Sequence, residues 1–135
     1  MATLRWAIAC FRIIIDRATN SVSYIDTVEA WSVPSLDSPL GPFNLGTVWE
    51  RETVGESIIH RIRVTNPAGE EVASLARELV HAEAIRHRSN MSLHIDQVKM
   101  VGRFLLHVEQ QVGGEWRTEV SIPLVVTLEE EAERE

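Results

Sequence analysis

Apolar and polar residues alternate most regularly over residues 102–126, on either side of Gly113-Gly114. A period of two around a glycine-rich turn predicts a β-hairpin. A three-residue loop, residues 113–115, sets the apolar rows of the two strands opposite each other, with Val108 facing Val120. A two-residue loop would set apolar residues against polar ones, so we predict the three-residue loop.

The rest of the chain shows the same alternation in shorter segments. Further strands are predicted at residues 4–15, 21–33, 44–53, 57–65 and 91–98. A turn at Val54-Gly55 is expected to close a hairpin that pairs Trp49 with His60. Residues 34–43, which hold three Pro and one Gly, are expected to form the longest loop.

Residues 71–82 fit two patterns. Their apolar positions follow a helical stripe, and several of the residues are good helix formers. Because the neighbouring segments all read as strands, we favour a strand and keep one short helix around residues 72–82 as the alternative.

About eight strands joined by short turns predict an all-β fold, a two-layer antiparallel β-sandwich. A closed barrel is the alternative architecture. A chain of 135 residues suits one domain with one core, which we assign to residues 1–128. Residues 129–135 are rich in Glu and are expected to form a solvated acidic C-terminal tail.

The net charge of −7 narrows the range of partners. Nucleic acid and an anionic membrane surface are not expected, because no cluster of Lys and Arg is dense enough to collect phosphates. No apolar run is long enough to span a membrane, and too few residues precede Cys10 for a signal peptide. Cys10 is the only cysteine, so the chain forms no internal disulfide, and we expect a cytoplasmic protein. Cys10 itself is expected to be a small buried side chain.

The sequence contains none of the searched motifs that carry chemistry. There is no glycine-rich phosphate loop, paired-cysteine motif, HExxH or GxSxG. We therefore predict no catalytic residue, no metal ligand and no cofactor, and we favour a protein that is not an enzyme. His60, His94 and His107 lie on separate predicted strands, and the sequence leaves open whether they meet in space.

Aromatic residues and arginines are the candidates for binding, since both are enriched at interaction sites. The candidate binding residues are Trp31, Trp49, Arg51 and His60. For the tryptophans, we favour a place in the core with the indole N–H satisfied over a role in binding. Trp6 is expected to pack in the core or on the sheet. The small basic patches of Arg61, Arg63, Arg86 and Arg88 with His87 are expected to lie on a solvated sheet face.

Several residues and short motifs have a spacing that is also found in a known group of proteins. They are Cys10, Asp16, Thr19-Asn20, Ser23, Trp49, Pro67-x-Gly69, Gly102-x-Phe104 and Ile122-Pro123-Leu124. In this spacing the chain resembles small uncharacterised bacterial proteins that carry a domain of unknown function, with an immunoglobulin-like or jelly-roll-like β-sandwich. It departs from them at residues 72–85, which look more helical. The resemblance implies the sandwich fold and no activity.

These observations predict a non-enzymatic interaction or scaffold module with an unknown protein partner. Pro123 has no N–H, so the last strand is expected at a sheet edge or at a bulge. An edge strand, this one or the first, could pair with a second subunit to give a homo-oligomer. The alternative is a small-molecule or carbohydrate-binding domain, hydrolytic or metal-binding, with a cleft near Trp49 and His60.

Overall fold

The computed structural model describes residues 2–16, 18–19, 22–79 and 84–129, and these form nine strands. The strands are β1 (Thr3–Ile15), β2 (Val22–Thr27), β3 (Ala30–Val33), β4 (Leu40–Glu50), β5 (Ile58–Thr65), β6 (Glu71–Leu79), β7 (Arg86–Ile95), β8 (Gly102–Val112) and β9 (Glu115–Leu128).

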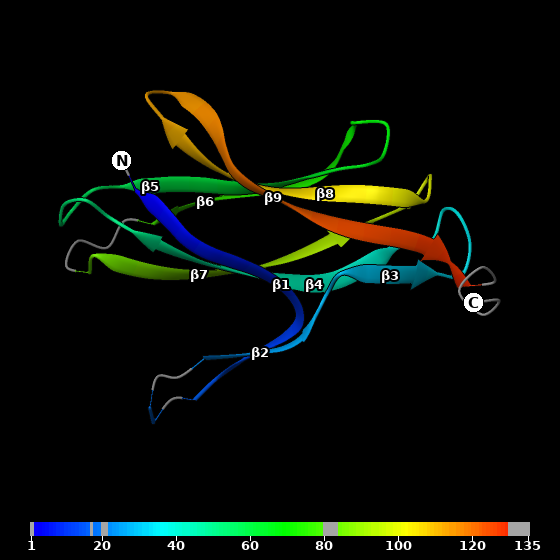
Figure 1. Ribbon diagram of the computed structural model, residues 1–135, viewed down its shortest axis with the longest axis horizontal. Helices are drawn as coiled ribbons and strands as arrows, with labels where there is room; N and C mark the ends of the chain where they lie inside the picture. Colours follow the sequence, from blue (N-terminus) through cyan, green and yellow to red (C-terminus); the bar gives the residue numbers. More distant parts are fainter. Residues whose placement is uncertain (1, 17, 20–21, 80–83, 130–135) are drawn as a thin grey trace.

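The strands form two sheets that pack as the layers of a β-sandwich (Figure 1). One sheet has the order β2-β1-β4-β7 and the other β3-β9-β8-β5-β6. Neighbouring strands are antiparallel except for β3 and β9, which are parallel. The predicted all-β sandwich is therefore confirmed, although the parallel pair was not predicted. The helix around residues 72–82 is wrong over residues 72–79, which lie in β6, while residues 80–82 fall outside the described part.

The core lies between the sheets and follows the predicted alternation. On β5, Ile58, Ile62 and Val64 point inward and are almost completely buried. Phe104, Leu106 and Val108 do the same on β8. The buried faces thus come from every second residue, as expected for strands with one face in the core.

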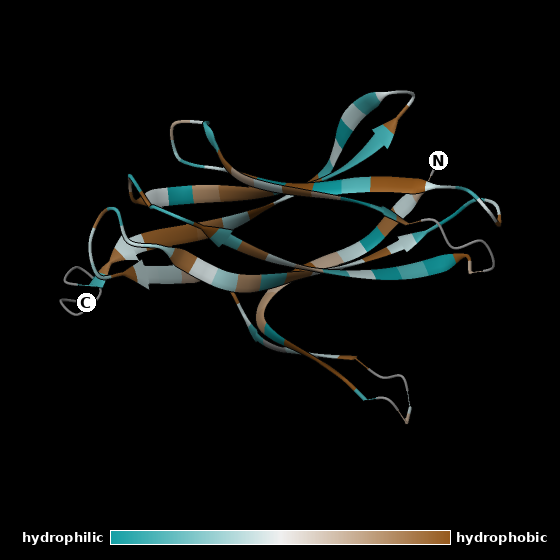
Figure 2. Ribbon diagram, turned by 180° about the vertical axis from the view of Figure 1, so that it is seen from behind, coloured by the Kyte–Doolittle hydropathy of each residue, from teal (hydrophilic) through white to brown (hydrophobic). Residues whose placement is uncertain are grey.

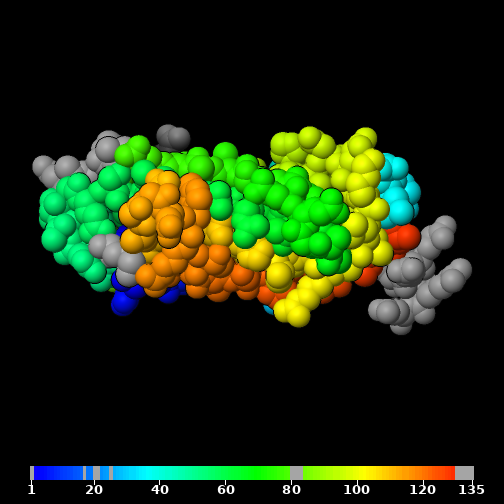
Figure 3. All heavy atoms as spheres, turned by 90° about the horizontal axis from the view of Figure 1, so that it is seen from above, coloured from blue at the N-terminus to red at the C-terminus, as the bar shows by residue number. Residues whose placement is uncertain are grey.

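The β8–β9 hairpin has a shorter loop than predicted, but its apolar rows do meet. Val112 pairs with Glu115 around Gly113 and Gly114, whose φ angles of 60° and 83° suit a two-residue turn. A bulge at Glu119 then restores the pairing of Val108 with Val120. Gly113 and Gly114 therefore set the length of the loop, and the buried face of the sheet sets the register of the two strands. The hairpin tip stands out from the sandwich (Figure 1, and orange in Figure 3).

The predicted hairpin between residues 44–53 and 57–65 is wrong. β4 and β5 belong to different sheets, so residues 51–57 cross between the layers. Trp49 pairs within its own sheet with Leu4 and His87. It reaches His60 across the core instead, with the ring centroids 5.4 Å apart.

The predicted strand at residues 21–33 is divided between the two sheets. Asp26 has a φ of 56°, and the chain then passes from β2 in one sheet to β3 in the other. Backbone hydrogen bonds from Val28 N to Ala9 O and from Val125 N to Glu29 O tie this crossing to both sheets. The β1–β2 hairpin projects away from the sandwich and carries apolar residues (Figure 1, Figure 2).

Candidate functional site

The first half of β1 is a free sheet edge. β2 pairs with β1 only from Cys10 to Ile15, so residues 3–9 have β4 on one side and no described strand on the other. The Ala9 carbonyl points to this free side, because it accepts a hydrogen bond from Val28 N (2.8 Å). Backbone groups alternate in direction along a strand, so the N–H and C=O of Ala7 also point there.

The first part of β9 is a second free edge. β3 pairs with β9 only from Val125 to Leu128, so among the described strands residues 115–124 pair with β8 alone. The Val125 N–H points away from β8, toward Glu29 O (3.0 Å). By the same alternation the nitrogen of Pro123 points away from β8, so this proline breaks no ladder hydrogen bond. The edge predicted from Pro123 is therefore confirmed for residues 115–124, while the end of the strand is covered by β3.

Two adjoining cavities lie between these free edges. One has a volume of about 210 Å³ and the other about 170 Å³. Ala7 lines both. The first is also lined by Trp6 of β1 and Val120 of β9, and the second by Ala9 and Ile122. The open side of the sandwich is therefore a groove that runs beside the unpaired backbone of β1.

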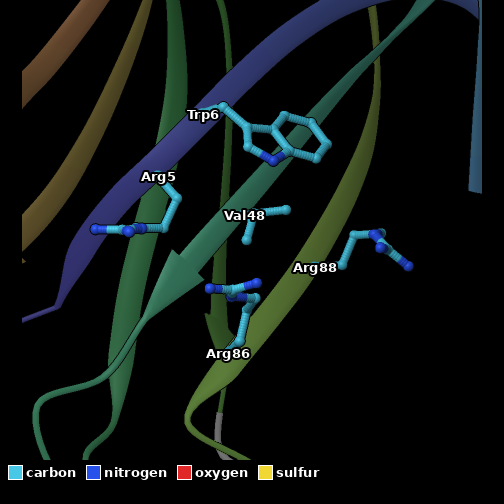
Figure 4. A pocket seen from close by; sticks show the side chains of 5 residues that line it. All are labelled: Arg5, Trp6, Val48, Arg86 and Arg88. Atoms are coloured by element: carbon cyan, nitrogen blue, oxygen red, sulfur yellow. The ribbon is translucent and has the colours of Figure 1, made fainter.

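A third and larger cavity, of about 360 Å³, adjoins this groove on the outer face of the four-stranded sheet (Figure 4). We call it the arginine pocket; it is lined by Arg5, Trp6, Val48, Arg86 and Arg88. In Figure 4, Val48 lies between Trp6 and Arg86, with Arg5 and Arg88 to either side. Arg5 and Trp6 also line the groove, so pocket and groove form one continuous surface.

Strand register brings the residues of the arginine pocket together. Trp6 pairs with Val48, and Val48 pairs with Arg88, so the three lie in one row across β1, β4 and β7. Arg5 is the extra residue of a bulge between Leu4 and Trp6. Bulges re-aim side chains at sheet edges, and this one places an arginine where pocket and groove meet.

The arginine pocket holds more positive than negative charge. Glu50 Oε2 lies 3.6 Å from Arg5 Nε and 3.2 Å from Arg86 Nη2, and this carboxylate is partly exposed. Arg88 lies close to Tyr24. Burial raises the pKa of the Tyr24 hydroxyl, and the charge of the Arg88 guanidinium acts to lower it. Tyr24 in turn meets Trp6 edge-on, with the ring centroids 5.1 Å apart. Three arginines against one glutamate leave a local excess of positive charge in a chain of net charge −7.

The outer face of the five-stranded sheet carries a different set of charges, which we call the Glu109 cluster: Arg61, Arg63, Glu109 and Thr118. Glu109 accepts hydrogen bonds from Arg61 Nε (2.7 Å), Arg63 Nε (3.2 Å) and Thr118 Oγ1 (2.6 Å). Its burial acts to raise the pKa, but the hydrogen bonds from Arg63, Thr118 and Arg61 outweigh it and lower the pKa to about 2. This carboxylate is already saturated by its own chain.

The three strand histidines lie in different surroundings. His60 is buried in the core, and His94 is exposed beside Asp96 (3.0 Å). His107 bridges Thr65 Oγ1 (2.9 Å) and Ser121 Oγ (2.7 Å) on the outer face of its sheet. Over the described ranges, no group of three or more His, Cys, Asp or Glu side chains is placed to hold a metal ion.

Two of the predicted binding residues, Trp49 and His60, contact each other inside the core. Both are 0% exposed, and the Trp49 indole donates to Thr47 Oγ1 (3.0 Å). Burial, followed by the charge of Arg77, lowers the pKa of His60 to about 4. Neither His60 ring nitrogen has a hydrogen-bond partner among the residues that the structure describes. A ligand at the surface does not reach either ring in this conformation.

The other two predicted residues lie elsewhere. Arg51 is buried and donates to the carbonyls of Leu79 (2.8 Å) and Ala84 (3.0 Å), so it fastens the ends of neighbouring segments. Trp31 is half-buried next to Phe11 and Phe43. Neither residue lines the groove or the arginine pocket.

Sequence reasoning missed the residues of the arginine pocket. Trp6 was expected in the core or on the sheet; it packs on the outer face of the sheet against Tyr24, 40% exposed, and its place at the pocket wall was not predicted. The spacing of Arg86 and Arg88 was a usable signal, since residues two apart share one face of a strand. The bulge at Arg5 and the neighbourhood of β1, β4 and β7 leave no local pattern.

Comparison with known proteins adds no assignment: no known family matches the chain, and no curated protein is similar to it. In the part of the chain that the structure covers, no helix has the length and apolar character to cross a bilayer.

Proposed function

We propose that this protein is a non-enzymatic interaction module that binds an extended segment of a partner protein along the free edge of β1. The observation that carries the proposal is the convergence of three cavities on residues 4–9 of one unpaired strand edge. Adding a strand to an exposed edge is a recurring mode of peptide recognition, in which the backbone supplies affinity and neighbouring pockets supply specificity.

The groove suits a strand that pairs with β1 rather than with β9. Ala7 offers an N–H and a C=O, and the small side chains of Ala7 and Ala9 leave room beside them. On β9, Pro123 offers no N–H, and the bulge at Glu119 interrupts the ladder. Bound on β1, the partner would extend the four-stranded sheet into the groove.

The arginine pocket favours an acidic group on the partner. Arginine binds carboxylate and phosphate through two parallel N–H donors. Trp6 and Val48 offer an apolar surface beside the arginines. We therefore expect a partner segment with alternating apolar residues and one or two acidic side chains at the end that reaches Arg5.

A pair of proline substitutions tests the proposal. Ala7→Pro removes an N–H that points into the groove and leaves the β1–β4 ladder intact; Ser121→Pro is the matched change on the β9 edge. The probe is a fluorescent peptide of about ten residues, alternating Val and Thr with two Glu at one end. We expect fluorescence anisotropy to show binding to the wild type and to S121P, and none to A7P, with circular dichroism confirming folded variants.

Equal binding to A7P and the wild type would contradict strand addition to β1, and so would loss of binding in S121P alone. No binding of the Glu peptide by the folded wild type at about 1 mM would contradict the proposed ligand class. Trp49 and His60 do not line a surface cleft, because both side chains are 0% exposed.

We also propose a bacterial origin, from the resemblance described above, and a cytoplasmic location, from the single cysteine. A bacterial, cytoplasmic protein with an immunoglobulin-like or jelly-roll-like sandwich agrees with an interaction module. Cys10 supports a reducing compartment, since it is 0% exposed and burial raises the pKa of its thiol. Fractionation of cells that express the chain, with detection by an antibody, tests the location.

A further inference from the structure

The arginine pocket has two chemically different halves. One half is apolar, because Trp6 pairs with Val48 across β1 and β4 and both side chains line the pocket. The other half is positively charged, since Arg5, Arg86 and Arg88 lie around these two residues (Figure 4). A ligand group that matches both halves needs an apolar body and an anionic end.

The positive charge of the pocket is large enough for a dianion. Three arginines against one glutamate, Glu50, leave two positive charges in excess. Glu119 of the adjoining groove is paired with Arg117 (3.1 Å) and does not reduce this excess. A carboxylate neutralises one positive charge, whereas a phosphate on a side chain carries about −1.5 to −2 at pH 7. The charge of the pocket therefore matches a phosphate better than a single carboxylate.

Glu50 shows that two of these arginines can share one anionic oxygen. Its Oε2 atom lies 3.6 Å from Arg5 Nε and 3.2 Å from Arg86 Nη2. Each contact involves a single nitrogen, while a guanidinium can bind phosphate through two parallel N–H donors. The Glu50 side chain is 33% exposed, so it can turn toward solvent and leave this position to a phosphate oxygen.

The pocket is also larger than a carboxylate requires. Its volume of about 360 Å³ lies within the range of small-ligand pockets, roughly 300–1,000 Å³. Trp6 already meets Tyr24 edge-on and keeps 40% of its surface exposed. A second aromatic ring can therefore pack on Trp6 in the edge-on or offset arrangement that aromatic pairs prefer.

We propose that the arginine pocket binds a phosphorylated tyrosine of the partner segment, with its ring on Trp6 and Val48 and its phosphate between the three arginines. The inference rests on the proposed function, because it names the side chain that the pocket takes when the segment lies along β1. Arg5 and Trp6 line both the groove and the pocket, so a side chain that points outward beside them enters the pocket. Phosphorylation of the partner then controls its binding.

Four forms of the Val/Thr peptide test this inference. They carry phosphotyrosine, phosphoserine, tyrosine or the two Glu at the same end, and their affinities are compared by fluorescence anisotropy. We expect the phosphotyrosine form to bind about tenfold more tightly than the Glu form, because it supplies a second charge and an aromatic ring. The tyrosine form, which has the ring without the charge, should bind most weakly.

Substitutions separate the two halves of the pocket. Arg88→Ala should weaken binding of the phosphotyrosine form about tenfold. Arg103→Ala removes an equal charge from an exposed position on β8, outside the pocket, and should leave this affinity unchanged. Trp6→Ala should reduce the preference for phosphotyrosine over phosphoserine, a ratio in which any general loss of strand binding cancels. Circular dichroism confirms that each variant is folded.

The pH dependence of binding identifies the phosphate. Its second charge is lost below a pKa of about 6, so the phosphotyrosine form should bind about fivefold more weakly at pH 5 than at pH 7. The Glu form should change little, because an ordinary Glu has a pKa of about 4.3. The groups that face the ligand are Arg5 of β1, Tyr24 of β2, Glu50 of β4, and Arg86 and Arg88 of β7, and they act on both peptides.

Four results would overturn the inference and leave the proposed function in place. They are equal affinity of the phosphotyrosine and Glu forms, equal affinity of the phosphotyrosine and tyrosine forms, an R88A variant that binds phosphotyrosine like the wild type, and a W6A variant that keeps the full preference over phosphoserine. If none of the four peptides binds the folded wild type at about 1 mM, both the inference and the proposed function are wrong.

Discussion

Two groups of arginines lie on the two outer faces of this sandwich, and they differ in what their carboxylate partner does. In the Glu109 cluster the acid is buried, with a side chain 4% exposed, and Arg61 Nε is 2.7 Å from its oxygen. In the arginine pocket the acid, Glu50, is 33% exposed and lies 3.2 Å and 3.6 Å from Arg86 and Arg5. A buried, saturated carboxylate makes a structural element, whereas a partly exposed one leaves arginines accessible to a ligand.

The two groups of arginines also differ in whether they line a cavity. The arginine pocket is hollow and adjoins the groove beside β1, while Arg61 and Arg63 line none of the three cavities described above. Arg61 is further occupied by Trp116, whose ring centroid lies 4.2 Å from its guanidinium carbon. Residue type alone therefore does not distinguish an accessible arginine from a structural one; the burial of its carboxylate partner does.

Removing the buried carboxylate should have the largest effect. Glu109→Gln leaves Arg61 and Arg63 without their shared anion. The shift of the Glu109 pKa from 4.5 to about 2 corresponds to a loss of about 3 kcal/mol in unfolding free energy at pH 7. Urea denaturation measures this loss. Glu50→Gln is the matched control and should cost less than about 1 kcal/mol; equal losses would remove the distinction between the two clusters.

At low pH, the wild type and E109Q should have nearly the same unfolding free energy. The folded pKa of Glu109, about 2, lies below its ordinary value of 4.5. Ionised Glu109 therefore stabilises the fold above pH 4.5, and this contribution is lost as the pH falls through 2. Burial lowers the pKa of His60 from 6.5 to about 4, which destabilises both proteins below pH 6.5 and cancels in the difference. A difference in unfolding free energy that persists undiminished to pH of about 2 would contradict this assignment.

The arginines of the pocket should affect binding and leave stability unchanged. Arg86→Ala removes a charge-assisted contact to the ligand, and we expect about tenfold weaker binding of the Glu peptide. Because the Arg86 side chain is exposed, the unfolding free energy of the R86A variant should differ from that of the wild type by less than about 0.5 kcal/mol. Isothermal titration calorimetry and urea denaturation of the same protein separate the two effects. A variant that loses stability and keeps its affinity would place Arg86 with the structural arginines.

The smallest effect is expected from Glu50→Gln on binding. Glu50 lies next to Arg5 and Arg86 and competes with an acidic ligand for them. Replacing its charge should strengthen binding of the Glu peptide by about threefold, within the range of a surface ion pair. Titration of the same peptide with Gln in place of Glu is the control, and its affinity should not change.

Local alternation was sufficient to predict the core of this fold. Val108 and Val120 meet as expected, because a buried face tolerates only one register. The same alternation explains why Ile58, Ile62 and Val64 share one buried face. Such predictions succeed because each depends on residues that are neighbours along one strand or across one turn.

Features that depend on distant segments were not predictable. Residues 86–90 are polar and show no strand pattern. They nevertheless extend β7, because they pair with β4, which is far away in the sequence. The crossing at residues 51–57 looks like a hairpin turn, since nothing local distinguishes a turn within a sheet from a turn between sheets. The proposed binding surface depends on β7 and on the bulge at Arg5. This dependence explains why the sequence pointed to Trp49 and His60 instead.

Amide chemical-shift mapping with the Glu peptide tests the central claim most directly, because it shows which group of arginines accepts an acidic strand. We predict that shifts concentrate on Trp6, Ala7, Val48, Arg86 and Arg88. Amides of Arg61, Arg63 and Glu109 should stay unchanged. Shifts centred on the Glu109 cluster, or no shifts at about 1 mM peptide, would contradict the claim that the free edge of β1 is the binding surface.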